Sequence, residues 1–219
     1  MMTRKVFWEA PYQTTLDTII SGVDSNQVKM NETIFYPFAG GQERDTGTIG
    51  GFEVKDVLKQ GTDLQYILPD DHTLQTGDTV TIKIDAERRY KLMRLHFAAE
   101  IVLELATQNL PGIIKIGAHI AESKARIDFL WENNIASAFP MLTEKAHNII
   151  NANYPIVSAF SDRDNERRYW EIEGFARVAC GGTHIRHTGE VGELRLKRKN
   201  IGKGKERIEI TVDARPVPQ

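Results

Sequence analysis

The first 85 residues alternate between short apolar runs and residues that form turns. The clearest strand covers residues 77–85, where β-branched side chains alternate with polar ones. Short strands separated by closely spaced turns are typical of a small all-β fold. We therefore predict an N-terminal β-barrel-like domain over residues 1–85. The expected turns lie at 22–26, 40–41, 47–51, 61–63, 69–71 and 77–78.

The pattern changes after Asp85, which is a good N-cap for a helix. Apolar residues then recur at steps of three and four, which predicts one long helix over residues 86–109 with an apolar stripe along one side. Pro111 and Gly112 would end it. The stripe consists of Leu92, Leu95, Ala99, Val102 and Ala106.

The remaining chain mixes both periodicities. A second helix is predicted over residues 142–152, and its apolar side chains fall on one side. The fold class is therefore α+β, with the helices of a domain over residues 86–219 packed on a largely antiparallel sheet. Strands are expected at residues 113–123, 125–129, 156–160, 169–175, 194–198 and 207–212.

The chain begins without the apolar run of a secretory signal, and no stretch reaches the length of a transmembrane helix. We expect a cytoplasmic protein without a membrane partner, and the sequence leaves its oligomeric state open. Cys180 is the only cysteine among 219 residues, so it has no intrachain disulfide partner.

The formal net charge of −2 excludes a protein that coats nucleic acid through bulk charge. Residues 195–207 differ, because they hold seven basic residues and one acid, Glu206. This run is either a solubilising face or a small phosphate-binding patch suited to the end of an RNA. The candidate RNA contacts within it are Lys203, Lys205 and Arg207.

Two pairs of metal-ligating residues lie far apart in the sequence. Cys180 precedes His184 by four residues across two glycines, and thiolate with imidazole is a favoured ligand pair for zinc. His96 and Glu100 are four apart on the predicted long helix, so they share one face. Together the pairs predict a metal site formed by His96, Glu100, Cys180 and His184.

Each pair also has a simpler interpretation. A lone cysteine is often a small buried hydrophobic residue. His96 and Glu100 are equally compatible with a solvated pair at the helix rim. Because they border the apolar stripe, we expect them instead to face a cleft beside the core.

Several sequence blocks resemble a known family, the AlaX-type proteins that edit mischarged alanine tRNA and are similar to the editing domain of alanyl-tRNA synthetase. The blocks occur in the family's order and cover nearly the whole chain. They are the glycine-rich segment 35–42 with Asp45 and Gly47, the helix segment 93–96, residues 123–129, the segment 180–184 with 188–190, and residues 203–209.

The resemblance implies a trans-acting hydrolase that removes serine or glycine from mischarged alanine tRNA. It implies tRNA as partner and one zinc ion as cofactor. Gly40, Gly41 and Gln42 would then contact substrate or tRNA. Thr183 would line the pocket or bind a substrate hydroxyl, although a threonine beside glycines is also a common turn or cap residue.

Glu100 departs from the family pattern, which has histidine at this position. Glu100 is either a metal ligand, a general base beside a site with three protein ligands, or a sign that activity is lost. His119 and His187 are reserve ligands. The alternative functions are a catalytically degenerate tRNA-binding relative with little metal, and a zinc-stabilised interaction module without an RNA partner.

Overall fold

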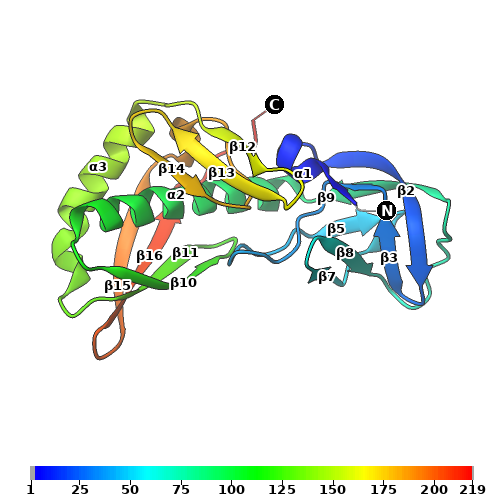
Figure 1. Cartoon of the computed structure of the whole chain (residues 1–219), viewed down its shortest axis with the longest axis horizontal. Helices are drawn as coiled ribbons and strands as arrows, with labels where there is room; N and C mark the ends of the chain where they lie inside the picture. Colours follow the sequence, from blue (N-terminus) through cyan, green and yellow to red (C-terminus); the bar gives the residue numbers. More distant parts are fainter. Residues whose placement is uncertain (1–2, 219) are drawn as a thin grey trace. The chain divides into compact units, whose positions relative to one another are not determined.

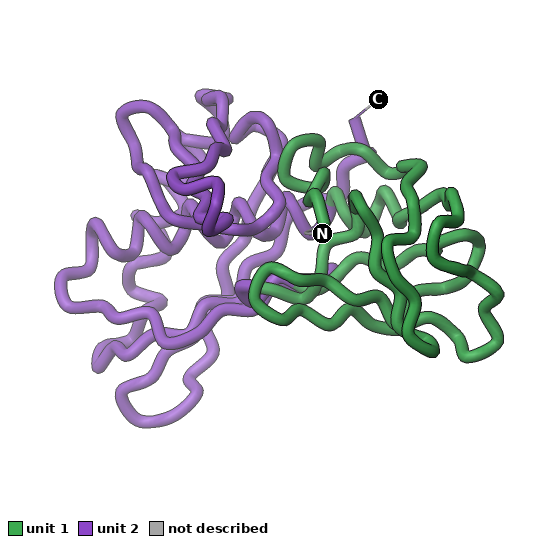
Figure 2. Tube along the Cα trace, turned by 45° about the vertical axis from the view of Figure 1, so that its right-hand side comes forward, with its two compact units in different colours: residues 1–39, 43–90 green, residues 40–42, 91–219 purple. Residues whose placement is uncertain are grey.

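The computed structural model describes residues 3–218, and the chain divides into two compact units. Unit 1 comprises residues 1–39 and 43–90, and unit 2 comprises residues 40–42 and 91–219 (Figure 2). The short segment 40–42 therefore belongs to unit 2 by its contacts, although unit 1 residues flank it on both sides.

Unit 1 is a curled seven-stranded antiparallel sheet with the order β6-β5-β9-β2-β3-β8-β7. Its apolar side chains, including Ile20, Val28 and Tyr66, form a buried core. The strand predicted over residues 77–85 is confirmed as β9. The strands are β2 (Thr15–Asp24), β3 (Gln27–Met30), β5 (Gly47–Ile49), β6 (Phe52–Glu53), β7 (Asp56–Gln60), β8 (Asp63–Ile67) and β9 (Thr79–Ile84). A short helix α1 (Val6–Glu9) and a parallel pair, β1 (Arg4–Lys5) with β4 (Glu32–Thr33), complete it.

Unit 2 contains two antiparallel sheets, with the orders β10-β11-β16-β15 and β12-β13-β14. Mixed α/β structure with antiparallel sheets is thus observed. The strands are β10 (Ile114–Ile120), β11 (Ala125–Leu130), β12 (Val157–Asp162), β13 (Arg167–Ile172), β14 (Ala176–Ala179), β15 (Leu194–Gly202) and β16 (Lys205–Val212). The helices are α2 (Ala86–Asn109), α3 (Phe139–Asn151) and the short 3-10 turns η1 (Ile135–Ala138) and η2 (Thr188–Val191).

Helix α2 has the bounds that the sequence predicts, and Asp85 caps it through a 3.0 Å hydrogen bond from the Arg88 amide. Its burial is not one-sided, because every residue from 92 to 99 is buried. Figure 1 shows the reason: within unit 2 the helix runs between the two sheets. His96 and Arg94 lie in this buried stretch. Buried polar side chains need hydrogen-bond partners, so each of the two must be paired within the protein.

Several element boundaries differ from the prediction; β15, for example, runs on to Gly202, and β16 begins at Lys205. Helix α3 begins at Phe139, earlier than expected, because Pro140 fits the first turn of a helix, where its missing N–H is not needed. The expected strand 169–175 ends early, because β13 stops at Ile172 and a tight turn follows at Gly174, whose φ is +75°. The next strand, β14, begins beyond the expected range and was not predicted. In the described part of the chain, no helix is long and apolar enough to cross a membrane.

Candidate metal centre

Three potential ligands from distant parts of the chain meet in unit 2. His96 lies on α2, and Cys180 and His184 lie in the loop between β14 and η2. Their donor atoms all lie within 4.8 Å of one another. The Cys180 sulfur is 3.3 Å from Nε2 of His96 and 3.3 Å from Nε2 of His184.

Glu100, the fourth candidate ligand, borders this group. Its Oε1 atom lies 3.4 Å from Nε2 of His96 and 3.9 Å from the Cys180 sulfur. Neighbouring donors of a tetrahedral zinc ion are ~3.3–3.7 Å apart, given bond lengths of ~2.0 Å to nitrogen and ~2.3 Å to sulfur. The separations of the Cys180 sulfur from the two histidines and of Glu100 from His96 fall within that range. The group of donors that all lie close to one another consists of His96, Cys180 and His184, and Glu100 stands outside it.

His96, His184 and Glu100 each form a hydrogen bond with a polar side chain outside the cluster. Oε1 of Gln42 lies 2.6 Å from Nδ1 of His96, and Oγ of Ser158 lies 2.9 Å from Nδ1 of His184. The indole of Trp170 donates a 2.8 Å hydrogen bond to Oε2 of Glu100. Such outer contacts fix the orientation of metal ligands.

These contacts also indicate the tautomer of each histidine. Oε1 of Gln42 is a pure acceptor, so Nδ1 of His96 must carry a proton to bond with it. Once Nε2 loses its proton, its lone pair points toward the sulfur of Cys180. The same arrangement holds for His184 when its Nδ1 donates to Ser158. Both rings therefore offer Nε2 as the inward ligand.

Charge in the metal-free cluster favours the ligand forms of Cys180 and Glu100. Burial alone would raise the pKa of the Cys180 thiol, but His96 and His184 lower that pKa to about 6. Burial would likewise raise the pKa of Glu100, but His96 and Trp170 lower it to about 2. For His96, burial is outweighed by the Cys180 and Glu100 charges, which raise its pKa to about 10. A thiolate and a carboxylate are thus stabilised by positive charge, which a bound cation can supply.

Two glycines of the predicted motifs are required by close contacts. A Cβ atom on Gly182 would lie 2.0 Å from Cε1 of His96, so no other residue fits between the loop and the ring. A Cβ atom on Gly41 would lie 2.6 Å from the carbonyl oxygen of Ala118 on β10. Gly41 has a φ of +86°, which also favours glycine.

The second part of the motif, residues 188–190, anchors the loop. Thr188 is fully buried, and its hydroxyl donates to the Ile149 carbonyl at the end of α3. The Glu190 carboxylate accepts hydrogen bonds from the amides of Arg186 and His187. Arg94 of α2 binds the carbonyls of Glu190 and Val191 at 2.9 and 2.7 Å. These bonds hold the loop against the helix that carries His96.

Thr183 lies beside the ligands but is only 1% exposed. Its hydroxyl accepts a 2.9 Å hydrogen bond from Nε2 of Gln42, and its amide donates to Oε1 of the same side chain. Gly40 precedes this contact with a φ of +60°. Gln42 thus joins His96 to Thr183.

The remaining predicted residues lie elsewhere in unit 2. Lys203 and Lys205 are exposed at the β15–β16 turn, and Arg207 on β16 forms an ion pair with Asp128 at 2.6 Å. The reserve ligand His187 caps η2, and His119 lies on β10 opposite Arg126. Neither belongs to the ligand group.

Ser158 and Trp170 were not predicted as site residues. Both belong to the sheet β12-β13-β14, where they are paired across neighbouring strands. Neither residue stands in a spacing pattern with the ligands, so only the tertiary fold reveals their role.

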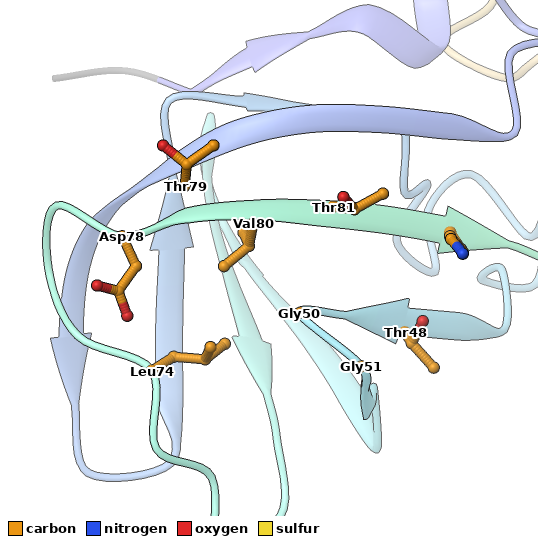
Figure 3. Close-up of a pocket in the computed structure, with 9 residues that line it drawn as sticks. Thr48, Gly50, Gly51, Leu74, Asp78, Thr79, Val80 and Thr81 are labelled. Atoms are coloured by element: carbon orange, nitrogen blue, oxygen red, sulfur yellow. The ribbon is translucent and has the colours of Figure 1, made fainter.

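A hollow of about 500 Å³ in unit 1 is a second candidate site. Figure 3 shows that Thr48, Thr79, Thr81, Val80 and Leu74 line it. Its carboxylate, Asp78, accepts a hydrogen bond from the Gln75 amide. The hollow holds none of the predicted site residues and no group of metal ligands.

Comparison with known proteins identifies the family of this chain. The family model described as the threonyl and alanyl tRNA synthetase second additional domain matches residues 169–209, which include Cys180 and His184. The alanyl-tRNA editing protein AlaX-M of Pyrococcus horikoshii is 30% identical over 216 residues, covering 97% of this chain and 99% of that protein. AlaX-M of Methanosarcina acetivorans is 30% identical over 244 residues, covering 96% of this chain and 99% of that protein.

The alanine–tRNA ligase of Ignicoccus hospitalis is 33% identical over 238 residues, covering 97% of this chain but only 26% of the ligase. The chain thus spans about a quarter of the ligase and essentially all of each AlaX-M protein. From its full-length similarity to the latter, this chain belongs to the AlaX family of alanyl-tRNA editing proteins.

Proposed function

We propose that this protein is a trans-acting deacylase that removes wrongly attached amino acids from alanine tRNA. Two findings support the proposal: the full-length match to proteins named for alanyl-tRNA editing, and the cluster of His96, Cys180 and His184. The second carries the proposal, because a degenerate relative has no need to keep three ligands within 4.8 Å.

The proposed substrates are seryl and glycyl esters of alanine tRNA. Water adds to the ester carbonyl and the bond to the ribose oxygen breaks, which releases the free amino acid and a ribose hydroxyl. Such an ester is already activated, so orientation of the reacting groups supplies much of the rate.

The proposed cofactor is one zinc ion held by His96, Glu100, Cys180 and His184. When bound, zinc would supply Lewis acidity beside the ester. The chain's own contribution is to hold these ligands in place, through Gln42 on His96 and Ser158 on His184.

Glu100 has one oxygen available for chemistry. Trp170 engages Oε2, so Oε1 is left either to bind the ion or to accept a proton. We propose direct ligation, because Oε1 lies at ligand spacing from His96. Thr183 is proposed as a positioning residue, since its hydroxyl bonds to Gln42 and is buried.

The test uses alanine tRNA charged separately with serine, glycine and alanine. We expect release of serine and glycine well above the rate in buffer, with little release of alanine. Cys180→Ala is the control, since it removes the thiolate and should abolish the rate. Release of neither serine nor glycine above buffer would refute the proposal.

A second candidate is a tRNA-binding relative without catalytic metal. One observation favours it: Glu100 and His96 form an ion pair at 3.4 Å that satisfies both groups without an ion. Metal analysis of the purified protein separates the two functions. We expect close to one zinc per chain for the deacylase and almost none for the binding relative.

Glu100→His provides the matching comparison. A histidine there restores the ligand pattern usual in the family, so it should increase zinc content if Glu100 is a weak ligand. Unchanged zinc content and unchanged deacylation would place position 100 outside the ligand set.

We also propose a role for each of the two predicted domains. Residues 86–219 would form the editing domain and residues 1–85 a β-barrel-like domain. Gly40 and Gly41 would contact the substrate end of the tRNA, whereas Gln42 is buried and would act by orienting His96. A cytoplasmic location follows from a substrate that is charged tRNA.

A further inference from the structure

The basic residues of strand β15 lie on two faces of the strand. Arg195, Lys197 and Lys199 occupy alternate positions and are exposed, whereas Leu194 is buried on the other face. Side chains of a strand alternate in direction, so the three exposed residues form a row with neighbours ~6.6–6.8 Å apart. β15 is an edge strand of its sheet, so the row lies along an open border.

The arginines in and beside this row form ion pairs. Arg198 pairs with the buried carboxylate of Glu206 at 2.5 Å, and Arg207 pairs with Asp128. Arg195 pairs with Glu193 at 3.2 Å.

The lysines of the hairpin differ from the arginines. Among the described residues, Lys197, Lys199, Lys203 and Lys205 make no ion pair. Glu209 faces Lys197 across the ladder, but its carboxylate is bound by Lys124 at 2.6 Å.

The turn of the hairpin, like the row, has a carboxylate nearby. A Cβ atom on Gly204 would lie 2.7 Å from Oε1 of Glu132, so that carboxylate approaches the turn that holds Lys203 and Lys205. Lys197 and Lys199 lie near Glu209, but Lys124 already binds that carboxylate, so both lysines can still attract an anion. Because the chain as a whole carries −2, this concentration of positive charge is local.

We propose that Lys197 and Lys199, extended by Lys203 and Lys205, bind the phosphate backbone of the tRNA body. The inference rests on the proposed function, which makes tRNA the substrate. Figure 1 shows the β15–β16 hairpin projecting away from the sheet β12-β13-β14, which leads into the loop of Cys180 and His184. We therefore expect the row to contact a part of the tRNA distant from the aminoacyl ester. Contacts to phosphates do not depend directly on base sequence, so the row should bind tRNA without sequence preference.

The test compares Lys197→Gln/Lys199→Gln with a control, Lys55→Gln/Lys59→Gln, which removes the same charge from exposed positions in unit 1. The dissociation constant of uncharged alanine tRNA is measured from 50 to 300 mM salt for both variants and the wild type. Each lost phosphate contact weakens binding roughly tenfold near 0.1 M salt and lowers the slope of log affinity against log salt by about 0.9. We expect a 10- to 100-fold loss for the row variant and none for the control.

Hydrolysis measured in parallel separates this inference from the proposed function. The row variant should raise KM for seryl-tRNA without changing kcat, and should hydrolyse 3′-seryl-adenosine, which lacks a tRNA body, at the wild-type rate. A wild-type protein that binds tRNA through the row but hydrolyses neither ester would overturn the proposed function and leave the row intact.

Equal tRNA affinity and equal salt slope in the row variant and wild type would overturn the inference, whatever the hydrolysis rates. Binding to vesicles that contain phosphatidylserine, with no salt-dependent binding to tRNA, would also overturn it. Thermal unfolding of each variant verifies that the fold is kept.

Discussion

The α-carbon of Gly182 lies so close to His96 that a methyl group on it would come within 2.0 Å of the imidazole. The ring cannot move aside freely, because Gln42 holds its Nδ1 atom. We expect Gly182→Ala to displace His96 from the cluster and to weaken zinc affinity by at least about tenfold, the effect seen when the support of a ligand is lost. Competition with a chelating indicator measures this affinity.

Gly181→Ala is the matched control for that experiment. A Cβ atom on Gly181 meets no atom within 4 Å, and the residue is exposed. Its zinc affinity should equal that of the wild type. Equal losses in the two variants would indicate general loop damage rather than contact with His96.

Gln42 should affect metal binding strongly, although it is not itself a candidate ligand, because it orients His96. Gln42→Ala leaves the buried Nδ1–H of His96 without its acceptor and Thr183 without its donor. We expect zinc affinity to fall about 10- to 100-fold, since loss of an outer partner has effects of this size. Gln75→Ala, at an exposed position in unit 1, serves as the control and should leave the affinity unchanged.

Removal of the metal should lower the stability of the fold. A ligand present at 100 times its dissociation constant stabilises the native state by about 2.7 kcal/mol. For a chain of this size we expect a chelator to lower Tm by about 5–10 °C, and added zinc to restore it. Cys180→Ser should show the lower Tm with or without chelator. A chelator-induced shift of the same size in that variant would mean that the metal binds elsewhere.

The ion pairs of Asp128 predict how stability depends on pH. Burial alone would raise the pKa of this carboxyl, but the hydrogen bonds from Arg207 and the charge of Arg126 lower it below the ordinary value. A carboxyl with a lowered pKa in the folded state adds stability above the unfolded pKa of about 3.9, and this contribution is lost as pH falls through the folded value.

We therefore expect Asp128→Asn to reduce the free energy of unfolding by about 1–3 kcal/mol at pH 7. The deficit relative to wild type should shrink toward pH 3, as measured by urea unfolding at both pH values with the metal content held constant. Asp71→Asn, at an exposed position, should show little deficit at either pH. A deficit independent of pH would mean that packing, not charge, explains the effect of Asp128.

The sequence could predict the elements that carry the ligands because the relevant signals are local. The spacing of four residues places His96 and Glu100 on one side of any helix. Asp85 as an N-cap and Pro111 with Gly112 as a stop made the extent of that helix predictable, and its bounds are confirmed. The cysteine and histidine of the second pair are separated by two glycines and Thr183, and the close approach of His96 explains why Gly182 must be glycine.

Long-range contacts explain what the sequence could not predict. The burial of α2 on all sides depends on two sheets whose strands come later in the chain. Ser158 and Trp170 contact the ligands only because β12 and β13 pair beside the helix. β14 is only four residues long and follows a glycine turn, so it carries too few residues to show a periodicity.

The placement of residues 40–42 has a consequence for any shortened form of the gene. These residues precede α2 by more than forty positions, yet they count among the contacts of unit 2. A fragment that started at residue 86 would keep His96, Glu100, Cys180 and His184 and would lose the amide that orients the first of them. Such a truncated product would need a substitute acceptor for Nδ1, supplied by a redesigned loop or by water.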